Sequence, residues 1–171
     1  MKKSKLIFIL ILLFAVFVIA VNFTSCKKST EPDFKGNPAN AYFLVFEKLY
    51  EESTGLNSDI KYIAIDLTGA KLKEKPDLIK LFEKFCEENN YTLWQDTIQG
   101  LKEKGYIVDE YPVYFPDGFV ISFKDDLLED NKLVTKGSKW RSDLGAYGAT
   151  YTAEKINGEW EVTNIADGWK N

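Results

Sequence analysis

The segment 138–149 combines side chains that can bind a ligand. Trp140 and Tyr147 present rings on which a ligand can stack, and Arg141, the only arginine of the chain, offers a planar fork that suits an anion. Glycines beside these residues indicate a strand bulge or a close approach of another backbone. We expect either a small binding surface formed by the three side chains, or a bulged sheet corner in which Trp140 packs in the core and Arg141 pairs with Asp143 or a nearby glutamate.

Catalysis by carboxylates is the second chemistry that the sequence allows. Asp66, Asp143 and Asp167 are candidates for a general acid or base, although no diagnostic spacing connects them. Asp66 is the lone acid of an apolar strand, so it either points inward and is functional or begins the turn that follows the strand. The chain contains no histidine, which excludes Ser-His-Asp and Cys-His catalysis and histidine-ligated zinc.

The best candidate for a metal site is the acidic stretch around Asp125. Asp125 and Asp126, followed by Glu129 and Asp130, offer the oxygen ligands that calcium prefers. Their spacing matches no calcium loop, and a charged turn between strands explains the same pattern. We therefore expect no metal and no cofactor.

Cys26 has the surroundings of a cysteine that is modified during export. Three lysines among the first five residues precede an uncharged apolar run at 6–21, and the segment 23–26 resembles the lipobox that ends bacterial lipoprotein signals. Cleavage before Cys26 and acylation of its thiol by chains such as palmitate would anchor the mature protein. The same run is long enough to remain as an uncleaved transmembrane helix, and plain secretion is the third alternative.

All three alternatives place the residues after Cys26 outside the cytoplasm, and the first places the domain on the cell membrane or the outer membrane through its lipid. Removal of residues 1–25 takes three of the 22 basic residues and none of the 26 acidic ones, which leaves a net charge of −7. An acidic surface argues against nucleic acid as a partner. The other cysteine, Cys86, lies on the apolar stripe of a predicted helix, and we interpret it as a small core residue.

Capping residues predict helices in the first half of the domain. Asn37 followed by Pro38 predicts an N-cap with proline at the first helical position, and Pro76 opens a second helix. Asp96 is expected to cap a short third helix at 97–104.

Alternation of apolar and polar residues indicates strands in the second half. Asn157 followed by Gly158 is the strongest hairpin signal, because a type I′ turn needs positive φ at both central residues. We also expect a hairpin in which a turn at 116–118 joins two neighbouring strands. The predicted strands are 60–67, 91–94, 111–115, 119–124, 132–142, 145–156 and 159–165.

These elements predict an α+β domain, with the helices on one face of a twisted, mainly antiparallel sheet of four or five strands. The expected organisation is a signal peptide or membrane anchor at 1–25, a polar tether at 26–36 and a single domain at 37–171.

Several segments resemble a family of small exported bacterial proteins of unknown function. The likeness rests on the segments 56–67, 101–105, 139–148 and 157–162. It implies a single exported domain, with no assigned activity or site residue.

Two functions remain open from the sequence. The favoured hypothesis is a non-enzymatic binding domain held at the membrane by its lipid, with a protein or a small ligand as its partner. The rival hypothesis is a carboxylate-based hydrolase outside the cytoplasm, which requires carboxylates that converge in one cavity with opposed pKa values.

Overall fold

Two amphipathic helices form where capping and proline residues start them. Helix α2 (Pro38–Glu52) begins after Asn37, whose side-chain oxygen accepts a hydrogen bond of 2.9 Å from the backbone nitrogen of Ala39. Helix α3 (Lys75–Glu88) has Pro76 in its first turn. Both starts confirm the sequence predictions, because such residues suit the backbone groups that a helix end leaves without partners.

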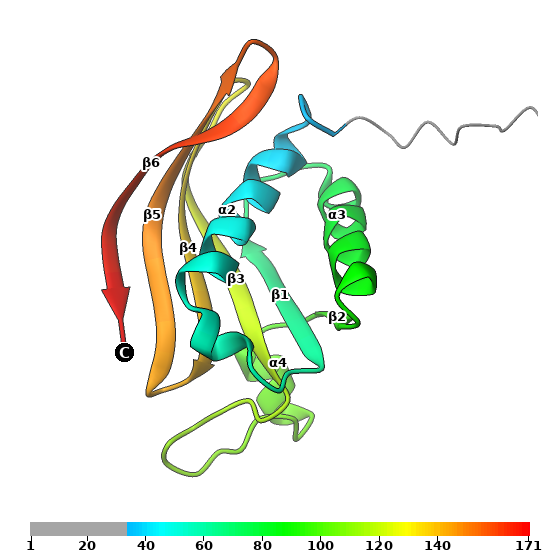
Figure 1. Ribbon diagram of the computed structural model, residues 1–171, viewed down its shortest axis with the longest axis vertical. Helices are drawn as coiled ribbons and strands as arrows, with labels where there is room; N and C mark the ends of the chain where they lie inside the picture. Colours follow the sequence, from blue (N-terminus) through cyan, green and yellow to red (C-terminus); the bar gives the residue numbers. More distant parts are fainter. Residues whose placement is uncertain (1–33) are drawn as a thin grey trace, which may run out of the picture. The chain divides into compact units, whose positions relative to one another are not determined.

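The strands form one mixed sheet in the computed structural model, which describes residues 34–171 (Figure 1). The strands are β1 (Tyr62–Gly69), β2 (Thr92–Gln95), β3 (Gly118–Leu128), β4 (Lys132–Ser142), β5 (Gly145–Ile156) and β6 (Glu159–Lys170). Their order in the sheet is β2-β1-β3-β4-β5-β6. Strand β1 is parallel to β2 and β3, whereas the pairs from β3 to β6 are antiparallel. This is the α+β class that the sequence predicts.

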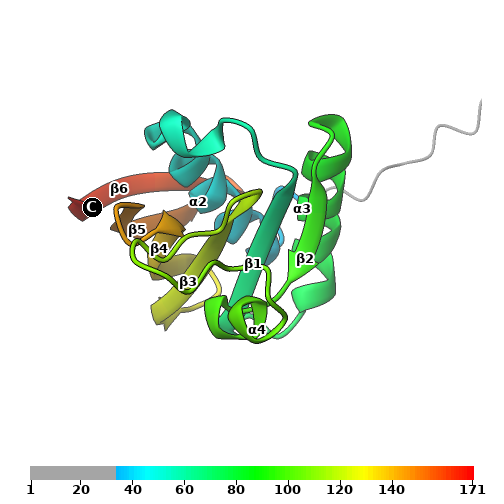
Figure 2. The same cartoon turned by 90° about the horizontal axis from the view of Figure 1, so that it is seen from below.

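Helices lie on both faces of this sheet. Helices α2 and α3 pack on one face, which we call the inner face, and the short helix α4 (Ile98–Glu103) packs on the outer face (Figure 2). Successive residues of β1 alternate accordingly: Ile63 and Ile65 belong to the inner core, and Ala64 packs with Leu101 of α4. The expected helix layer on one face holds for α2 and α3, and α4 lies on the other face.

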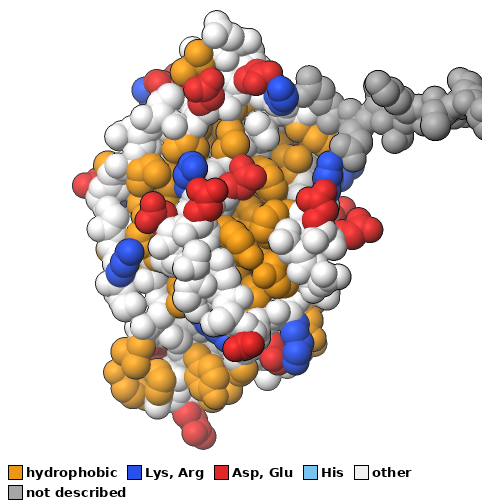
Figure 3. All heavy atoms as spheres, in the orientation of Figure 1, with side chains coloured by type: hydrophobic (Ala, Val, Ile, Leu, Met, Phe, Trp, Pro, Cys, Tyr) orange, Lys and Arg blue, Asp and Glu red, His pale blue; other side chains and the backbone are white. Residues whose placement is uncertain are grey.

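Aromatic rings fill the inner core. The ring of Phe46 lies 4.7 Å from that of Phe82 and 4.8 Å from that of Phe85, measured between centroids. Tyr42 of α2 packs edge-on against Phe123 of β3 at 5.4 Å. Further apolar side chains are visible between α2 and α3 in Figure 3. Burial of each large apolar side chain stabilises the fold by roughly 1.5–3 kcal/mol. The packing of α2 and α3 on the sheet therefore holds the neighbouring strand ends in place.

Residues 111–115 do not form the hairpin that their pattern suggests, because β3 pairs with β1 in parallel. The segment instead binds the far end of the sheet. The carbonyl oxygen of Val113 accepts a 2.9 Å hydrogen bond from the backbone nitrogen of Asp143, and the nitrogen of Phe115 donates to the carbonyl of Arg141 at 2.7 Å. The predicted hairpin is wrong because alternation marks an extended chain without specifying its neighbour.

Two local predictions have different outcomes. Asn157 and Gly158 have φ values of 53° and 88°, which confirms the hairpin turn between β5 and β6. The cap of α4 is Thr97, whose hydroxyl accepts a hydrogen bond from the nitrogen of Gly100 at 2.9 Å, so the prediction of Asp96 as the cap is wrong by one residue.

Candidate functional site

The chain leaves β1 and β2 on opposite sides of the sheet. After β1 it crosses the inner face through α3, and after β2 it crosses the outer face through α4. Neighbouring parallel strands whose connections diverge in this way leave a crevice at their carboxyl ends, where ligands of open α/β sheets commonly bind. The carboxyl ends of β1 and β2 are therefore the candidate functional site.

A crevice of about 350 Å³ occupies this position. Strand β2 pairs with residues 62–65 of β1 and stops, so no described strand lies beside the rest of β1 on that side. Residues from the start of α3 and from the segment that leads into α4 complete the lining. The lining residues are Ile65, Asp66, Leu67, Thr68, Lys75, Ile79, Gln95, Asp96 and Thr97.

The carboxylate of Asp66 is oriented by the end of its own strand. Its Oδ1 accepts hydrogen bonds from the backbone nitrogen of Thr68 at 2.9 Å and from the Thr68 hydroxyl at 2.6 Å. These bonds correspond to the turn that the sequence offered as one alternative for Asp66. Within residues 34–171 its Oδ2 accepts no hydrogen bond, so half of the carboxylate remains available in the crevice.

Lys75 brings a positive charge to the same crevice from the first turn of α3. Its Nζ donates a 2.9 Å hydrogen bond to the carbonyl oxygen of Leu67, which leaves two of the three ammonium protons available. Among the described residues, Asp66 and Lys75 form no ion pair with each other or with a third side chain. Each of these two charged side chains therefore lines the crevice without an ion-pair partner among the described residues.

Asp96, in contrast, is committed to neighbouring residues. Its Oδ1 accepts a 2.9 Å hydrogen bond from the nitrogen of Thr97, and its Oδ2 binds Nζ of Lys104 at 2.5 Å. The hydrogen bond from Lys104 holds the pKa of Asp96 below its ordinary value. Asp96 is therefore a fixed, ionised part of the wall.

The remaining lining residues set what the crevice can hold. Leu67 and Ile79 supply aliphatic surface, and Gln95 supplies an amide donor and acceptor. Apolar walls with a few polar groups are typical of small-molecule sites. The arrangement can bind and orient a small ligand that carries charges.

The binding residues predicted from the sequence do not share one surface. Trp140 pairs with Ala146, and Tyr147 pairs with Lys139, so the rings of Trp140 and Tyr147 project to opposite faces of the sheet. Trp140 packs against the cluster on the outer face, and Tyr147 is buried in the inner core. The bulged-corner alternative matches the observed placement of Trp140, and a register shift does occur beside it.

Arg141 binds backbone carbonyl groups instead of the acidic partner that the sequence suggested. Its Nη1 donates to the oxygens of Leu56 and Ser58 at 3.3 and 2.6 Å, and its Nη2 donates to the oxygen of Pro116 at 3.0 Å. The guanidinium thereby joins the segment before β1 to the turn before β3, and both of its terminal nitrogens donate within the protein.

The candidate catalytic carboxylates lie on separate parts of the sheet. Asp66 belongs to β1, Asp167 to β6, and three strands lie between them. Asp143 is exposed at the turn between β4 and β5. The three carboxylates do not converge in one cavity.

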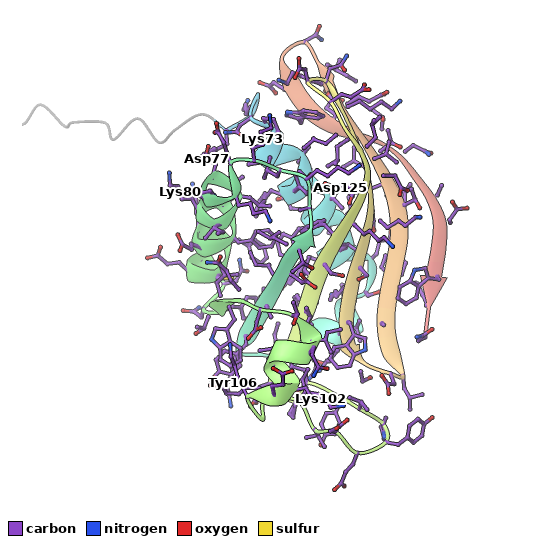
Figure 4. All side chains as sticks on the ribbon, turned by 180° about the vertical axis from the view of Figure 1, so that it is seen from behind. Lys73, Asp77, Lys80, Lys102, Tyr106 and Asp125 are labelled. Carbon is purple, nitrogen blue, oxygen red and sulfur yellow. The ribbon has the colours of Figure 1, made fainter. Side chains whose placement is uncertain are left out.

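Asp125, the candidate metal ligand, is buried on β3 facing α2 (Figure 4). Its Oδ2 accepts hydrogen bonds from the hydroxyl of Tyr42 and from the backbone nitrogen of Lys71, the latter at 2.6 Å. Asp126 forms an ion pair with Lys136 at 3.4 Å. Within residues 34–171, no three side chains of the types that ligate metals come together.

Sequence reasoning missed Lys139, which has no exposed surface. Its Nζ donates to the carbonyl oxygen of Ser53 at 2.9 Å and to Oδ1 of Asn57, and it lies 4.8 Å from the centroid of the Phe119 ring. Burial lowers the pKa of Lys139 to about 8. Because residues of β4 alternate between faces, counting in twos from the apolar Leu133 would have placed Lys139 inside.

The two cysteines fall in different parts of the chain. Cys86 is a buried free thiol whose pKa is raised to about 11 by burial, in agreement with the interpretation as a core residue. Cys26 and the apolar run before it lie outside the described residues. Within residues 34–171, no helix has the length and hydropathy needed to cross a membrane.

Comparisons with known proteins give no further constraint on the site. No family, no curated protein and no solved structure matches this chain. The resemblance to a family of exported proteins therefore stays a prediction.

Proposed function

We propose that this protein is an exported domain, anchored by a lipid on Cys26, that binds a small ligand in the crevice at the ends of β1 and β2. The observation that carries the binding role is the pair Asp66 and Lys75, which line one crevice without neutralising each other. The anchor rests on the export signal and on the lipobox-like segment before Cys26.

The chain between the anchor and the domain limits where the domain can work. From Cys26 to Phe34 the backbone can extend by at most roughly 25–30 Å, at about 3.4 Å per residue. The proposed protein therefore acts close to the surface of the cell membrane or the outer membrane.

A binding role agrees better with the site than catalysis does. A carboxylate pair that works as acid and base needs one member with a raised pKa. In the crevice, Asp96 has a lowered pKa and is held by Lys104, and Asp66 is held by Thr68. This arrangement supports recognition of a charged ligand.

The anchor can be tested by metabolic labelling with a palmitate analogue. The wild-type chain should carry the label and be cleaved before Cys26, whereas Cys26→Ser should lose the label and either be released or remain as an uncleaved precursor. Cys86→Ser, which changes the buried thiol, is the matched control and should keep the label. If Cys26→Ser is processed and anchored like the wild type, the lipid anchor is wrong and an uncleaved helix replaces it.

The binding site can be located by hydrogen exchange on the full chain in detergent. A set of small charged and neutral compounds is added one at a time, and at least one should slow exchange in peptides that cover 65–68 and 95–97. The same compound should have no effect on Asp66→Asn, whereas Asp143→Asn, an exposed carboxylate outside the crevice, should behave like the wild type. Protection elsewhere, or in no peptide, would contradict the proposed site.

A further inference from the structure

We infer that the ligand of the crevice is a zwitterion with an aliphatic side chain, such as a free aliphatic amino acid. This inference rests on the proposed function, because it names the class of ligand for the same crevice. It is carried by the charges, the volume and the walls of that crevice.

The charges require a ligand with both signs. Asp66 has a free carboxylate oxygen that can accept from an ammonium group, and Lys75 has two free protons that can bind a carboxylate. Hydrogen bonds between such charged groups are the strong class of hydrogen bonds in proteins. A ligand with an ammonium group and a carboxylate satisfies both residues at once.

Ligands of a single charge fit less well. A phosphate would meet one available cation, Lys75, beside the two carboxylates Asp66 and Asp96. A metal ion would meet Asp66 alone, because both oxygens of Asp96 already accept hydrogen bonds. Each of these ligands leaves one charge of the crevice without a partner.

The size and the walls define the rest of the ligand. The volume of about 350 Å³ lies near the lower end of the ~300–1,000 Å³ that small-molecule sites occupy. Leu67 and Ile79 form an aliphatic wall beside the charges. A side chain of similar size to that of leucine can cover this wall and remove it from water.

The inference can be tested by calorimetric titration of the full chain in detergent with four probes. L-Leucine carries both charges, leucinamide lacks the carboxylate, 4-methylpentanoate lacks the ammonium group, and glycine lacks the side chain. Because one charge-assisted hydrogen bond contributes about 1.5–3 kcal/mol, each loss of charge should weaken binding roughly tenfold or more. Glycine should also bind more weakly than L-leucine.

Two variants show which residue recognises which charge. In Asp66→Asn, L-leucine should lose most of its advantage over 4-methylpentanoate while keeping its advantage over leucinamide. Lys75→Met should show the reverse pattern. Lys124→Met, an exposed lysine of β3 outside the crevice, should keep both ratios.

The outcomes separate the inference from the proposed function. If the three leucine-like probes bind equally, or if the variants leave the ratios unchanged, the zwitterion is wrong. If L-leucine does not bind but another compound protects the peptides 65–68 and 95–97 from exchange, the inference fails and the binding crevice stands. If no compound protects these peptides, the proposed function fails as well.

Discussion

Lys139 is a buried charge that a helix end helps to retain. Removal of its ammonium group from water favours the neutral amine, which is the cause of the pKa of about 8. The carbonyl oxygens of Ser53 and Tyr50 and the side chain of Asn57 favour the charged form. These partners lie at the end of α2 and around the 3₁₀ turn η1 (Thr54–Asn57), where carbonyl oxygens can accept hydrogen bonds beyond those of the helix.

Replacement of Lys139 by methionine should destabilise the fold. The substitution keeps the length of the side chain but leaves Oδ1 of Asn57 without its donor and removes one of the two donors to the oxygen of Ser53, which keeps the bond from the nitrogen of Leu56. The loss costs about 1–3 kcal/mol. Urea unfolding should report this loss. Lys132→Met is the control, because Lys132 lies on the same strand as Lys139 and forms an exposed ion pair with Glu154 of β5. Loss of this pair should change stability by less than about 1 kcal/mol. An equal effect of the two variants would contradict the structural role of Lys139.

The buried amine also predicts a pH dependence. The pKa of Lys139 is lowered from 10.5 to about 8 in the folded state. Below pH 8 both states hold the proton, whereas at higher pH the unfolded chain binds a proton that the folded chain has lost, so the free energy of unfolding rises. Between pH 7.5 and 9.5, the free energy of unfolding of the wild type should rise by roughly 1–2 kcal/mol relative to Lys139→Met.

The comparison with Lys139→Met removes the opposing effect of Cys86. The pKa of this thiol is raised from 9.0 to about 11, so its contribution lowers stability as pH rises above 9 in both chains. Urea unfolding at several pH values measures the difference between wild type and variant. A difference that stays constant with pH would show that Lys139 does not titrate in this range.

At the scale of elements, the start of α4 depends on the close contact of Gly100 with Asp96. A Cβ atom at Gly100 would lie 2.0 Å from Oδ1 of Asp96 and 2.9 Å from its Cγ. Asp96 is in turn held by Thr97 and Lys104. Glycine is therefore required here by space, although it disfavours a helix interior.

Gly100→Ala should destabilise the protein by about 1–3 kcal/mol, because overpacking outweighs the helix propensity of alanine. Thermal unfolding measures the change. Gly55→Ala in η1 is the matched control, since a Cβ there meets no atom within 4 Å. In an Asp96→Ala background the cost of Gly100→Ala should largely disappear. The same cost in both backgrounds would exclude the contact as its cause.

At the scale of the whole molecule, the two faces of the sheet carry cores of unequal size. The inner core joins α2, α3 and most strands, whereas the outer cluster has only a few buried members around Leu101, Ile107 and Phe115. Trp94 extends the outer cluster, with its ring 4.4 Å from that of Tyr106, which Figure 4 shows beside α4. Residues 98–117 therefore have less burial to hold them than the strands do.

This imbalance predicts that residues 98–117 open before the rest of the domain. Native-state hydrogen exchange should show lower protection there than in β3, β4 and β5, because local opening follows the density of buried contacts. Leu101→Ala should increase exchange mainly within 98–117. A uniform increase over the whole domain would indicate that the outer cluster unfolds only together with the inner core.

Local structure was predictable where neighbouring residues determine it. Asn37 and Pro38 start α2, Pro76 lies in the first turn of α3, and Asn157 with Gly158 turns β5 into β6. The strands β4 and β5 have the predicted bounds. In each case a cap, a fixed φ or an alternation acts over a few residues, so no distant partner is needed.

The sequence by itself thus determined most elements and the α+β class, while the tertiary structure decided where the candidate site lies. The crevice exists because β1 pairs in parallel with both β2 and β3 and because the chain leaves the two strand ends on opposite faces. The partners of Arg141, the separation of Trp140 from Tyr147 and the burial of Lys139 follow from the same register. A short-range pattern marks a strand, but its neighbour is chosen by competition among distant segments for one sheet edge and one buried face.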